Sequence, residues 1–237
     1  MPDSHILEIT VDTLDRALAA ERGGAHRIEL CSDLPSGGLT PSVELMRLTR
    51  QQVCLPIFAM IRPRAGDYVY SGAEFAQIQR DLEAAAEVGM DGVVLGILTG
   101  DGRVDVERTQ QLVEQARPLP VTFHRAFDIS SDLRKSLEAV IQTGAARVLT
   151  SGGAISAIEG RAQLAELVQR ARGRVIIVPG AGITAANVEL VAKETGAGEF
   201  HAGLSSVSPG ESTNEQSFAD EVGKLVEQLT RHQHRHD

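Results

Sequence analysis

The stretch ILEITVDTLDRALAAERGGAHRIELC, residues 6–31, holds two short apolar runs on either side of a longer amphipathic segment. The runs, Ile6–Val11 and Arg27–Cys31, have the length and the β-branched content of strands. The segment between them begins near Asp12 and has the character of a helix. The Gly24-Ala25 joint that follows it supplies a glycine where helices commonly end in a left-handed residue. The stretch therefore predicts a strand–helix–strand unit.

The same alternation repeats along the whole chain, and glycine recurs at the later joints Gly89, Gly144 and Gly196. Strands are expected at Ile6–Val11, Arg27–Cys31, Ile57–Arg62, Gly92–Gly96, Val121–Arg125, Arg147–Ser151, Val175–Pro179 and Glu199–Ala202. Helices are expected to begin near Asp12, Pro41, Gly72, Asp105, Ser131, Ile155 and Thr184, with Asp12, Asp105 and Thr184 as N-caps and Pro41 in a first turn. A last helix is expected over Glu215–Leu229.

Eight strand–helix units in 237 residues predict one α/β domain over residues 1–230, a (β/α)8 or TIM barrel with an extra C-terminal helix. A doubly wound open sheet is the alternative. It would more naturally show a shorter chain or a dinucleotide-binding fingerprint in its first turn, and neither is present. The barrel is therefore the preferred fold.

Composition narrows the classes of function. The chain has 23 basic and 32 acidic side chains, a net charge of −9, and no Trp, which argues against a nucleic-acid partner. No window reaches the roughly 18 apolar residues of a membrane span, and the first residues do not resemble a signal peptide. Two cysteines do not make a disulfide framework. We therefore expect a cytoplasmic protein with neither a nucleic-acid nor a membrane partner.

Polar residues occupy alternate positions of the expected strands, as in Glu8 and Thr10 or Thr122 and His124. Successive side chains of a strand face opposite ways, so in a barrel these residues point into the lumen. Charged groups there must be paired, because an unpartnered buried charge costs several kcal/mol. We expect one polar cluster at the C-terminal mouth, where barrel active sites lie, formed by Glu8, Glu29, Arg62, His124 and His201. Structural ion pairs that fill the barrel are the alternative.

Several long motifs point to a known family. They are MIRPRAGDYVY at residues 60–70, DGVVLG at 91–96, DGRVD at 101–105, VTFHRAFD at 121–128, VLTSGG at 148–153 and VPGAGI at 178–183. The opening adds LEI at 7–9, RIELC at 27–31 and GGLTP at 37–41. From about residue 6 to residue 207 the chain resembles the CutC family. The resemblance implies a TIM barrel and a cytoplasmic homo-oligomer, either a dimer or a tetramer. It also implies a role in copper homeostasis, in which the protein binds copper as Cu(I).

Cu(I) prefers thiolates and thioethers, so the cysteines test this expectation. Cys31 ends the second strand at the mouth, whereas Cys54 precedes the third strand at the opposite end, about 20 Å away at 3.3 Å per residue. The two thiols therefore cannot share one ion within a chain. Cys31 is the candidate metal ligand, together with Met60, Met46, His201 or a cysteine of a neighbouring subunit. Cys54 is expected to be a small buried packing residue.

The C-terminal residues 231–237 are expected to form a disordered tail. The tail carries three alternate histidines, His232, His234 and His236, which have incidental affinity for Cu(II), Ni(II) or Zn(II). It lies outside the region that resembles the CutC family.

An enzyme is the alternative function, acting on a small phosphorylated or carboxylated metabolite by general acid–base chemistry. Its candidate catalytic residues are Glu8, Glu29, His124 and His201. Its candidate anion-binding residues are Arg62 and Arg64 after the third strand, Ser151 and Gly152 after the sixth, and Gly180 and Gly182 after the seventh. Asp128 is expected either to orient His124 or to cap the next helix.

Overall fold

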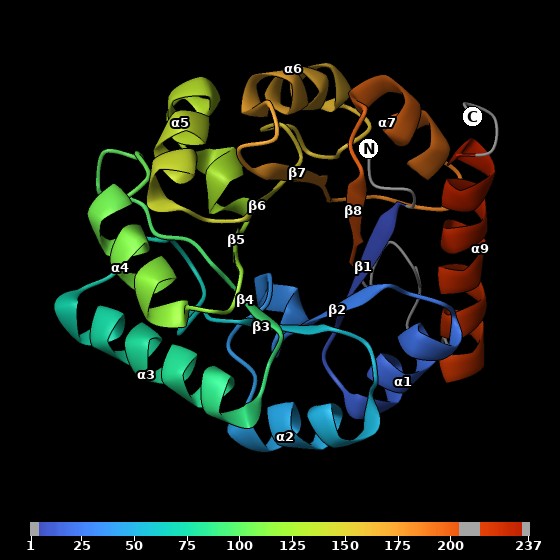
Figure 1. Cartoon of the computed structure of the whole chain (residues 1–237), viewed down its shortest axis with the longest axis horizontal. Coiled ribbons are helices and arrows are strands. Elements are labelled where there is room, and N and C mark those ends of the chain that lie inside the picture. Colours follow the sequence, from blue (N-terminus) through green and yellow to red (C-terminus); the bar gives the residue numbers. More distant parts are fainter. Residues whose placement is uncertain (1–4, 204–213, 234–237) are drawn as a thin grey trace.

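Eight parallel strands form a ring at the centre of the molecule, and helices surround them (Figure 1). The structure is a computed structural model that describes residues 5–203 and 214–233. The strands are β1 (Ile6–Val11), β2 (Arg27–Leu30), β3 (Ile57–Met60), β4 (Gly92–Leu95), β5 (Val121–Phe123), β6 (Arg147–Thr150), β7 (Ile176–Pro179) and β8 (Glu199–Ala202). Hydrogen bonds join them in the order β7-β6-β5-β4-β3-β2-β1-β8, and β7 also contacts β8, which completes the ring. The predicted TIM barrel is confirmed.

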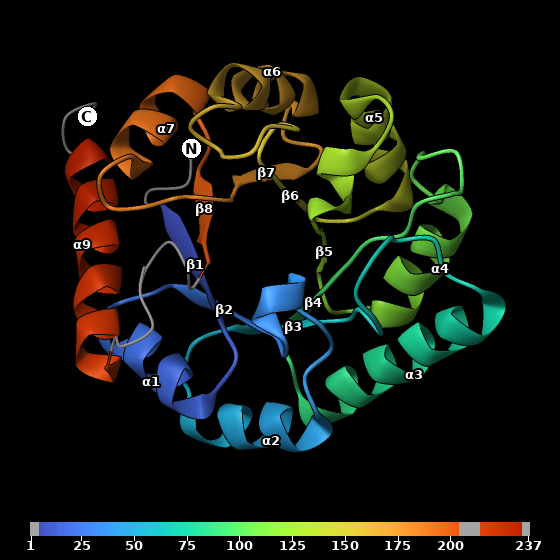
Figure 2. The same ribbon diagram turned by 180° about the vertical axis from the view of Figure 1, so that it is seen from behind.

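The helices follow the strands as a TIM barrel requires. They are α1 (Leu14–Arg22), α2 (Val43–Gln52), α3 (Gly72–Val88), α4 (Val106–Ala116), α5 (Leu133–Thr143), α6 (Arg161–Ala171) and α7 (Val188–Thr195), with 3-10 turns η1 (Leu34–Ser36) and η2 (Arg125–Ile129). The expected extra helix is present as α9 (Glu215–Gln233), which packs against α1 and α7 outside the ring (Figures 1 and 2). Among the described residues, no helix has the length and apolar character to cross a membrane.

Of the three predicted N-caps, one is correct and two are wrong. Asp105 caps α4 as predicted, because its carboxylate accepts a hydrogen bond from the backbone N–H of Arg108. At α1 the N-cap is Thr13, not Asp12, because the Thr13 hydroxyl accepts from the third residue of the helix. Thr184 does not cap α7, because its own N–H donates to the side chain of Asn187 in a turn that precedes the helix.

Two other helices begin later than predicted, and one ends later. Ser42 caps α2, so Pro41 lies before the helix and not in its first turn. Helix α6 begins at Arg161, six residues after the expected Ile155, since residues 151–160 form a turn-rich loop. Helix α9 continues to Gln233, past the expected end at Leu229, so the start of the expected tail is helical. Residues 234–237 lie outside the described part of the chain.

The alternation along the strands places apolar and polar side chains on opposite faces. Leu7 and Ile9 of β1, with Ile28 and Leu30 of β2, are fully buried in the layer between strands and helices. The intervening residues face the lumen, as the sequence predicts. Several strands end one or two residues early: β3 ends at Met60 and β5 at Phe123, so the residues next along the chain belong to the mouth loops.

Candidate functional site

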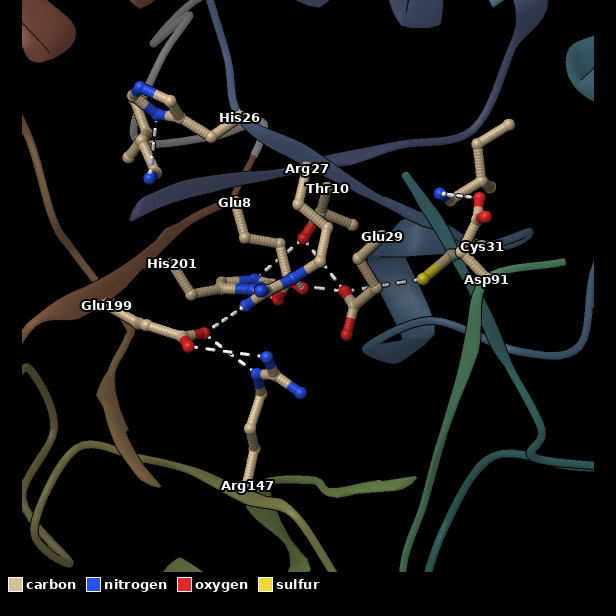
Figure 3. Close-up of polar contacts among 12 residues, drawn as sticks. Glu8, Thr10, His26, Arg27, Glu29, Cys31, Asp91, Arg147, Glu199 and His201 are labelled. Atoms are coloured by element: carbon tan, nitrogen blue, oxygen red, sulfur yellow. Dashed lines mark hydrogen bonds and ion pairs between the residues drawn. The ribbon is translucent and has the colours of Figure 1, made fainter. Parts of the chain in front are cut away.

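A buried network of charged side chains crosses the lumen from β1 and β2 to β6 and β8 (Figure 3). Glu8 lies at its centre, where its Oε2 accepts from Nε of Arg27 at 2.5 Å and its Oε1 is 2.7 Å from Nδ1 of His201. Arg27 also donates to Glu199 at 2.7 Å, and Arg147 donates to the same Glu199 oxygen at 2.8 Å. The network therefore pairs the charges that these four strands bring into the lumen.

The N-terminal end of the lumen is filled by an aromatic ring. The guanidinium carbons of Arg27 and Arg147 lie 4.8 and 5.4 Å from the centre of the Phe58 ring. Gly92 on the neighbouring strand leaves room for that ring, because a Cβ there would lie 2.6 Å from it. Arg27, Arg147 and Glu199 stand at the first residues of their strands. This end of the barrel is thus a packed, paired layer.

One step nearer the mouth, Glu29 and His201 face each other across β1. Thr10 lies between them: its hydroxyl donates to Glu29 Oε2 at 2.9 Å and is 2.7 Å from Nε2 of His201. The direct distance from His201 Nε2 to Glu29 Oε2 is 3.8 Å. The second carboxylate oxygen of Glu29, Oε1, is buried and has no hydrogen-bond partner among the described residues. In Figure 3 this oxygen points away from Thr10 and Cys31.

These contacts shift the ionisation of the three groups in different directions. Burial alone would raise the pKa of Glu8, but the Arg27 charge and the His201 hydrogen bond lower it to about 2. Burial raises the pKa of Glu29, against the attraction of His201. Burial would lower the pKa of His201, yet the carboxylates of Glu29 and Glu8 raise it above its usual value. Glu8 is therefore the fixed anion of the group.

The same three residues have the arrangement of a metal site. One ligand atom from each of Glu8, Glu29 and His201 lies within 4.8 Å of the others. Glu8 is already engaged by Arg27 and by Nδ1 of His201, which is how carboxylates orient metal-binding histidines. This leaves Nε2 of His201 and the carboxylate of Glu29 as the groups that could hold a cation.

Cys31 lies on the mouth side of Glu29 and is fully buried. Its thiol donates to Glu29 Oε2 at 3.5 Å, and burial followed by the Glu29 charge raises the pKa of the thiol well above its usual value. Cys31 and Met60 belong to one buried cluster with Phe58 and Val94. A Cβ on Gly38 would lie 3.1 Å from Cys31 Sγ and 3.5 Å from the Met60 methyl, so both side chains converge beneath Gly38.

The other sulfur-containing residues lie elsewhere. Met46 packs in the layer between strands and helices, away from the Cys31 cluster. Cys54 is exposed, so the expectation of a buried packing residue was wrong. Val53 fills the buried position beside it, and the backbone N–H of Cys54 donates to Glu21. The register of β2 on β3, with Ile28 opposite Ile57, places Cys31 just past the C-terminal end of β2, whereas Cys54 lies three residues before β3 begins.

Arg62 and His124 form a second group, so the expected single cluster is divided. Both pack against Tyr68: the centre of its ring lies 4.8 Å from the Arg62 guanidinium carbon and 4.9 Å from the centre of the His124 ring. Both residues are buried, but they share no hydrogen bond with Glu8 or His201. The cause is position around the ring: Arg62 and His124 follow β3 and β5, whereas Glu8 and His201 come from β1 and β8.

Arg64 does not point its guanidinium into the mouth. It is paired with Glu74 and with Asp67, the latter at 2.9 Å, and it also donates to the carbonyl of Val69 at 2.9 Å. The ring of Tyr70 packs against it. Arg64 thus holds the loop between β3 and α3 in shape.

The loop after β6 already contains a carboxylate. Asp128 of η2 accepts from the hydroxyl of Thr150 at 2.5 Å and from the backbone N–H groups of Ser151 and Gly153 at 3.0 Å. The N–H of Gly152 donates to Thr150 Oγ1. An external anion at Ser151 and Gly152 would therefore have to displace Asp128. Asp128 neither contacts His124 nor caps α5, whose N-cap is Asp132.

The two glycines after β7 have different roles. Gly180 lies beside Leu149 and His201: a Cβ there would lie 2.5 Å from Leu149 and 3.4 Å from Cβ of His201, so the missing side chain makes room chiefly for Leu149. Gly182 has a φ of 70°, which favours glycine. The loop after β8 lies mostly outside the described residues.

The comparisons with known proteins identify the family. The sequence profile of the CutC family matches residues 5–206. The chain belongs to the CutC family. It is 46% identical to the human copper homeostasis protein cutC homolog over 199 residues, which cover 84% of this chain and 73% of the human protein. It is 48% identical to a family protein CutC of Chromobacterium violaceum over 197 residues, 83% of this chain and 80% of the relative.

A solved CutC structure supports both fold and family. The Streptococcus agalactiae CutC, described as a copper homeostasis protein, superposes with a TM-score of 0.79 at 33% identity, covering 84% of this chain and 98% of the other. Within this CutC chain, sequence reasoning missed Arg27, Arg147 and Glu199 as members of the buried network. Arg147 begins β6 as Arg27 begins β2, and that shared position was the available signal. Tyr68 had no comparable signal, because it lies in a loop.

Proposed function

We propose that this CutC family protein takes part in copper homeostasis by binding Cu(I) at Cys31. The names of the human and streptococcal relatives support the role, and the convergence of Cys31 and Met60 beneath Gly38 carries the proposal. A thiolate and a thioether are the soft ligands that Cu(I) prefers. His201 and Glu29 lie on the other side of the thiol.

The charge of the site favours a monovalent ion. The thiol of Cys31 donates its hydrogen to the Glu29 carboxylate, and a bare thiolate at that position would lie beside an anion. Cu(I) carries the same charge as the thiol proton that it replaces, so the buried site keeps its total charge. A divalent ion would add one uncompensated charge in the interior, which is costly.

The setting that suits this chemistry is the cytoplasm. Both cysteines are free, and a reducing compartment maintains free thiols and Cu(I) alike. We propose a homo-oligomer there, either a dimer or a tetramer, and light scattering in solution measures which. A monomer at working concentrations would contradict that part of the proposal.

The deciding experiment is an anaerobic Cu(I) titration in competition with a strong chelator. The chain should carry alanine at His232, His234 and His236, so that the C-terminal histidines do not contribute. We expect one tightly bound Cu(I) per chain, lost in Cys31→Ser and weakened in Met60→Leu. Cys54→Ser is the matched control and should bind as the parent does. Binding that survives Cys31→Ser would reject the site.

A second candidate function is general acid–base catalysis on a small metabolite, and the Glu29–His201 pair favours it. The two groups lie 3.8 Å apart in the lumen, and the free Oε1 of Glu29 is a proton acceptor that no described residue uses. A thermal-stabilisation screen of small carboxylates and phosphates, followed by NMR detection of turnover, tests it. Turnover should disappear in Glu29→Gln and in His201→Gln, and its persistence in both would reject this candidate.

A further inference from the structure

Arg62 is a buried cation without an anion. It is only 3% exposed, and it forms no ion pair with any residue in the described ranges. Its two terminal nitrogens donate to backbone carbonyls: Nη1 to Ser36 and Gly38 at 2.9 and 3.2 Å, and Nη2 to Gly66 at 3.0 Å. These contacts fix the guanidinium but do not balance its charge, and an unbalanced buried charge is costly.

The remaining donor of Arg62 is also unused. Its Nε–H is buried and makes no geometrically formed hydrogen bond among the described residues, and the buried hydroxyl of Tyr70, which lies beside the Arg62 charge, also makes none. A buried donor without a partner costs roughly as much as a lost hydrogen bond. A ligand-binding arginine needs a guanidinium that is held in place and still has an N–H free to donate to the ligand. The two terminal nitrogens of Arg62 provide the first, and its Nε–H provides the second.

His124 supplies a second unused donor. Its Nδ1 accepts a hydrogen bond from the backbone N–H of Ala126 at 3.3 Å, so the ring proton of the neutral imidazole sits on Nε2. That Nε2 is buried and has no partner among the described residues. Burial and the Arg62 charge lower the pKa of His124 to about 3, so the ring stays neutral and donates one hydrogen bond.

The packing brings the two residues against one tyrosine ring at the mouth. His124 follows β5, and its ring lies over Gly96 of the next strand, where a Cβ would be 2.5 Å from Nδ1. Arg62, on the loop after β3, lies close enough to His124 for its charge to lower the pKa of the ring. Both side chains then pack against Tyr68.

We propose that the mouth of this barrel binds the carboxylate group of a small organic acid through Arg62 Nε–H and His124 Nε2–H. A carboxylate has one oxygen for each donor, and its single charge matches the single uncompensated charge of Arg62. Phosphate carries between one and two charges at neutral pH and has more oxygens than the two donors can serve, so it matches less well. The site shares no hydrogen bond with Cys31, so it stands whether or not copper binds.

The test uses the full-length protein and the probes acetate, glycolate and pyruvate, with inorganic phosphate and chloride at the same ionic strength. Binding is followed by the side-chain Nε–H resonance of Arg62 in ¹H–¹⁵N spectra and by the thermal midpoint. We expect saturable shifts with at least one carboxylate. Arg62→Lys and His124→Leu should each weaken the affinity about tenfold or more, as loss of a charge-assisted hydrogen bond predicts.

Arg103→Gln is the matched control, because Arg103 is an exposed arginine paired with Asp101. It should leave the affinity unchanged. If Arg62→Lys does not fold, His124→Leu decides the question alone. The proposal is overturned if none of the three carboxylates gives a saturable response, if the variants bind as the parent does, or if phosphate binds more tightly than every carboxylate.

Discussion

Oε1 of Glu8 lies 2.7 Å from Nδ1 of His201, and this contact decides which edge of the imidazole faces the lumen. With Nδ1 held, Nε2 is directed to Thr10 and Glu29, at 2.7 and 3.8 Å. Glu8 and His201 are register partners on the neighbouring strands β1 and β8, so the sheet itself sets their separation. Glu8 is thus a positioning residue for the histidine and the counter-ion of Arg27.

Glu8→Gln should strongly destabilise the protein. It removes the charge that neutralises Arg27 in the interior, and breaking a buried pair in this way costs about 3–5 kcal/mol. The midpoint of urea unfolding measures the effect. Glu138→Gln, which breaks an exposed ion pair with Arg174, is the control and should leave the midpoint close to that of the parent. Equal midpoints for the two variants would show that the network contributes little.

The sequence predicted the barrel and the lumen-facing positions for a simple physical reason. Strand side chains alternate between two faces, so the parity of Glu8, Glu29 and His201 was sufficient to place them in the lumen. The helix ends were also predictable, as at Gly89, whose φ of 84° suits the left-handed residue that ends α3.

Parity does not give the position around the ring or the contacts of loops. The separation of Arg62 and His124 from Glu8 depends on which strands neighbour which, and that order is a property of the closed sheet. The late start of α6 depends on Asp128, which reaches across from η2 to hold residues 150–153. Local propensity contains no information about such a long-range hydrogen bond.

His124 should make the protein less stable in acid. Its pKa is about 3 in the folded protein and about 6.5 when unfolded, so between these values the unfolded chain binds the extra proton. The contribution of His124 to the free energy of unfolding is therefore at its full value above pH 6.5. It falls by about 1.4 kcal/mol per pH unit as the pH drops towards 3. Urea unfolding across this range measures the slope. His124→Leu should show a shallower slope, and an unchanged slope would contradict the assignment.

Gly96→Ala should displace His124 and destabilise the fold. The new Cβ would lie 2.5 Å from Nδ1 of the ring, and overpacking of this kind costs about 1–3 kcal/mol. Gly100→Ala is the matched control, because nothing lies within 4 Å of the Cβ that it adds. Alanine restricts the unfolded chain more than glycine does, so the free energy of unfolding of Gly100→Ala should equal that of the parent or exceed it by up to about 1 kcal/mol. Thermal unfolding separates the two, and the same midpoint for both would refute the steric account.

The two cysteines should differ sharply in reactivity towards iodoacetamide. Cys54 is exposed, whereas Cys31 is fully buried and hydrogen-bonded to Glu29, with a thiol pKa raised well above its usual value. Only the accessible thiolate is alkylated, so Cys31 should react at least about a hundredfold more slowly in the folded protein and at a comparable rate in urea. Mass spectrometry of the labelled peptides measures both rates in one sample. Similar rates without denaturant would mean that Cys31 is open to solvent, and the buried cluster with Met60 would then not be the structure in solution.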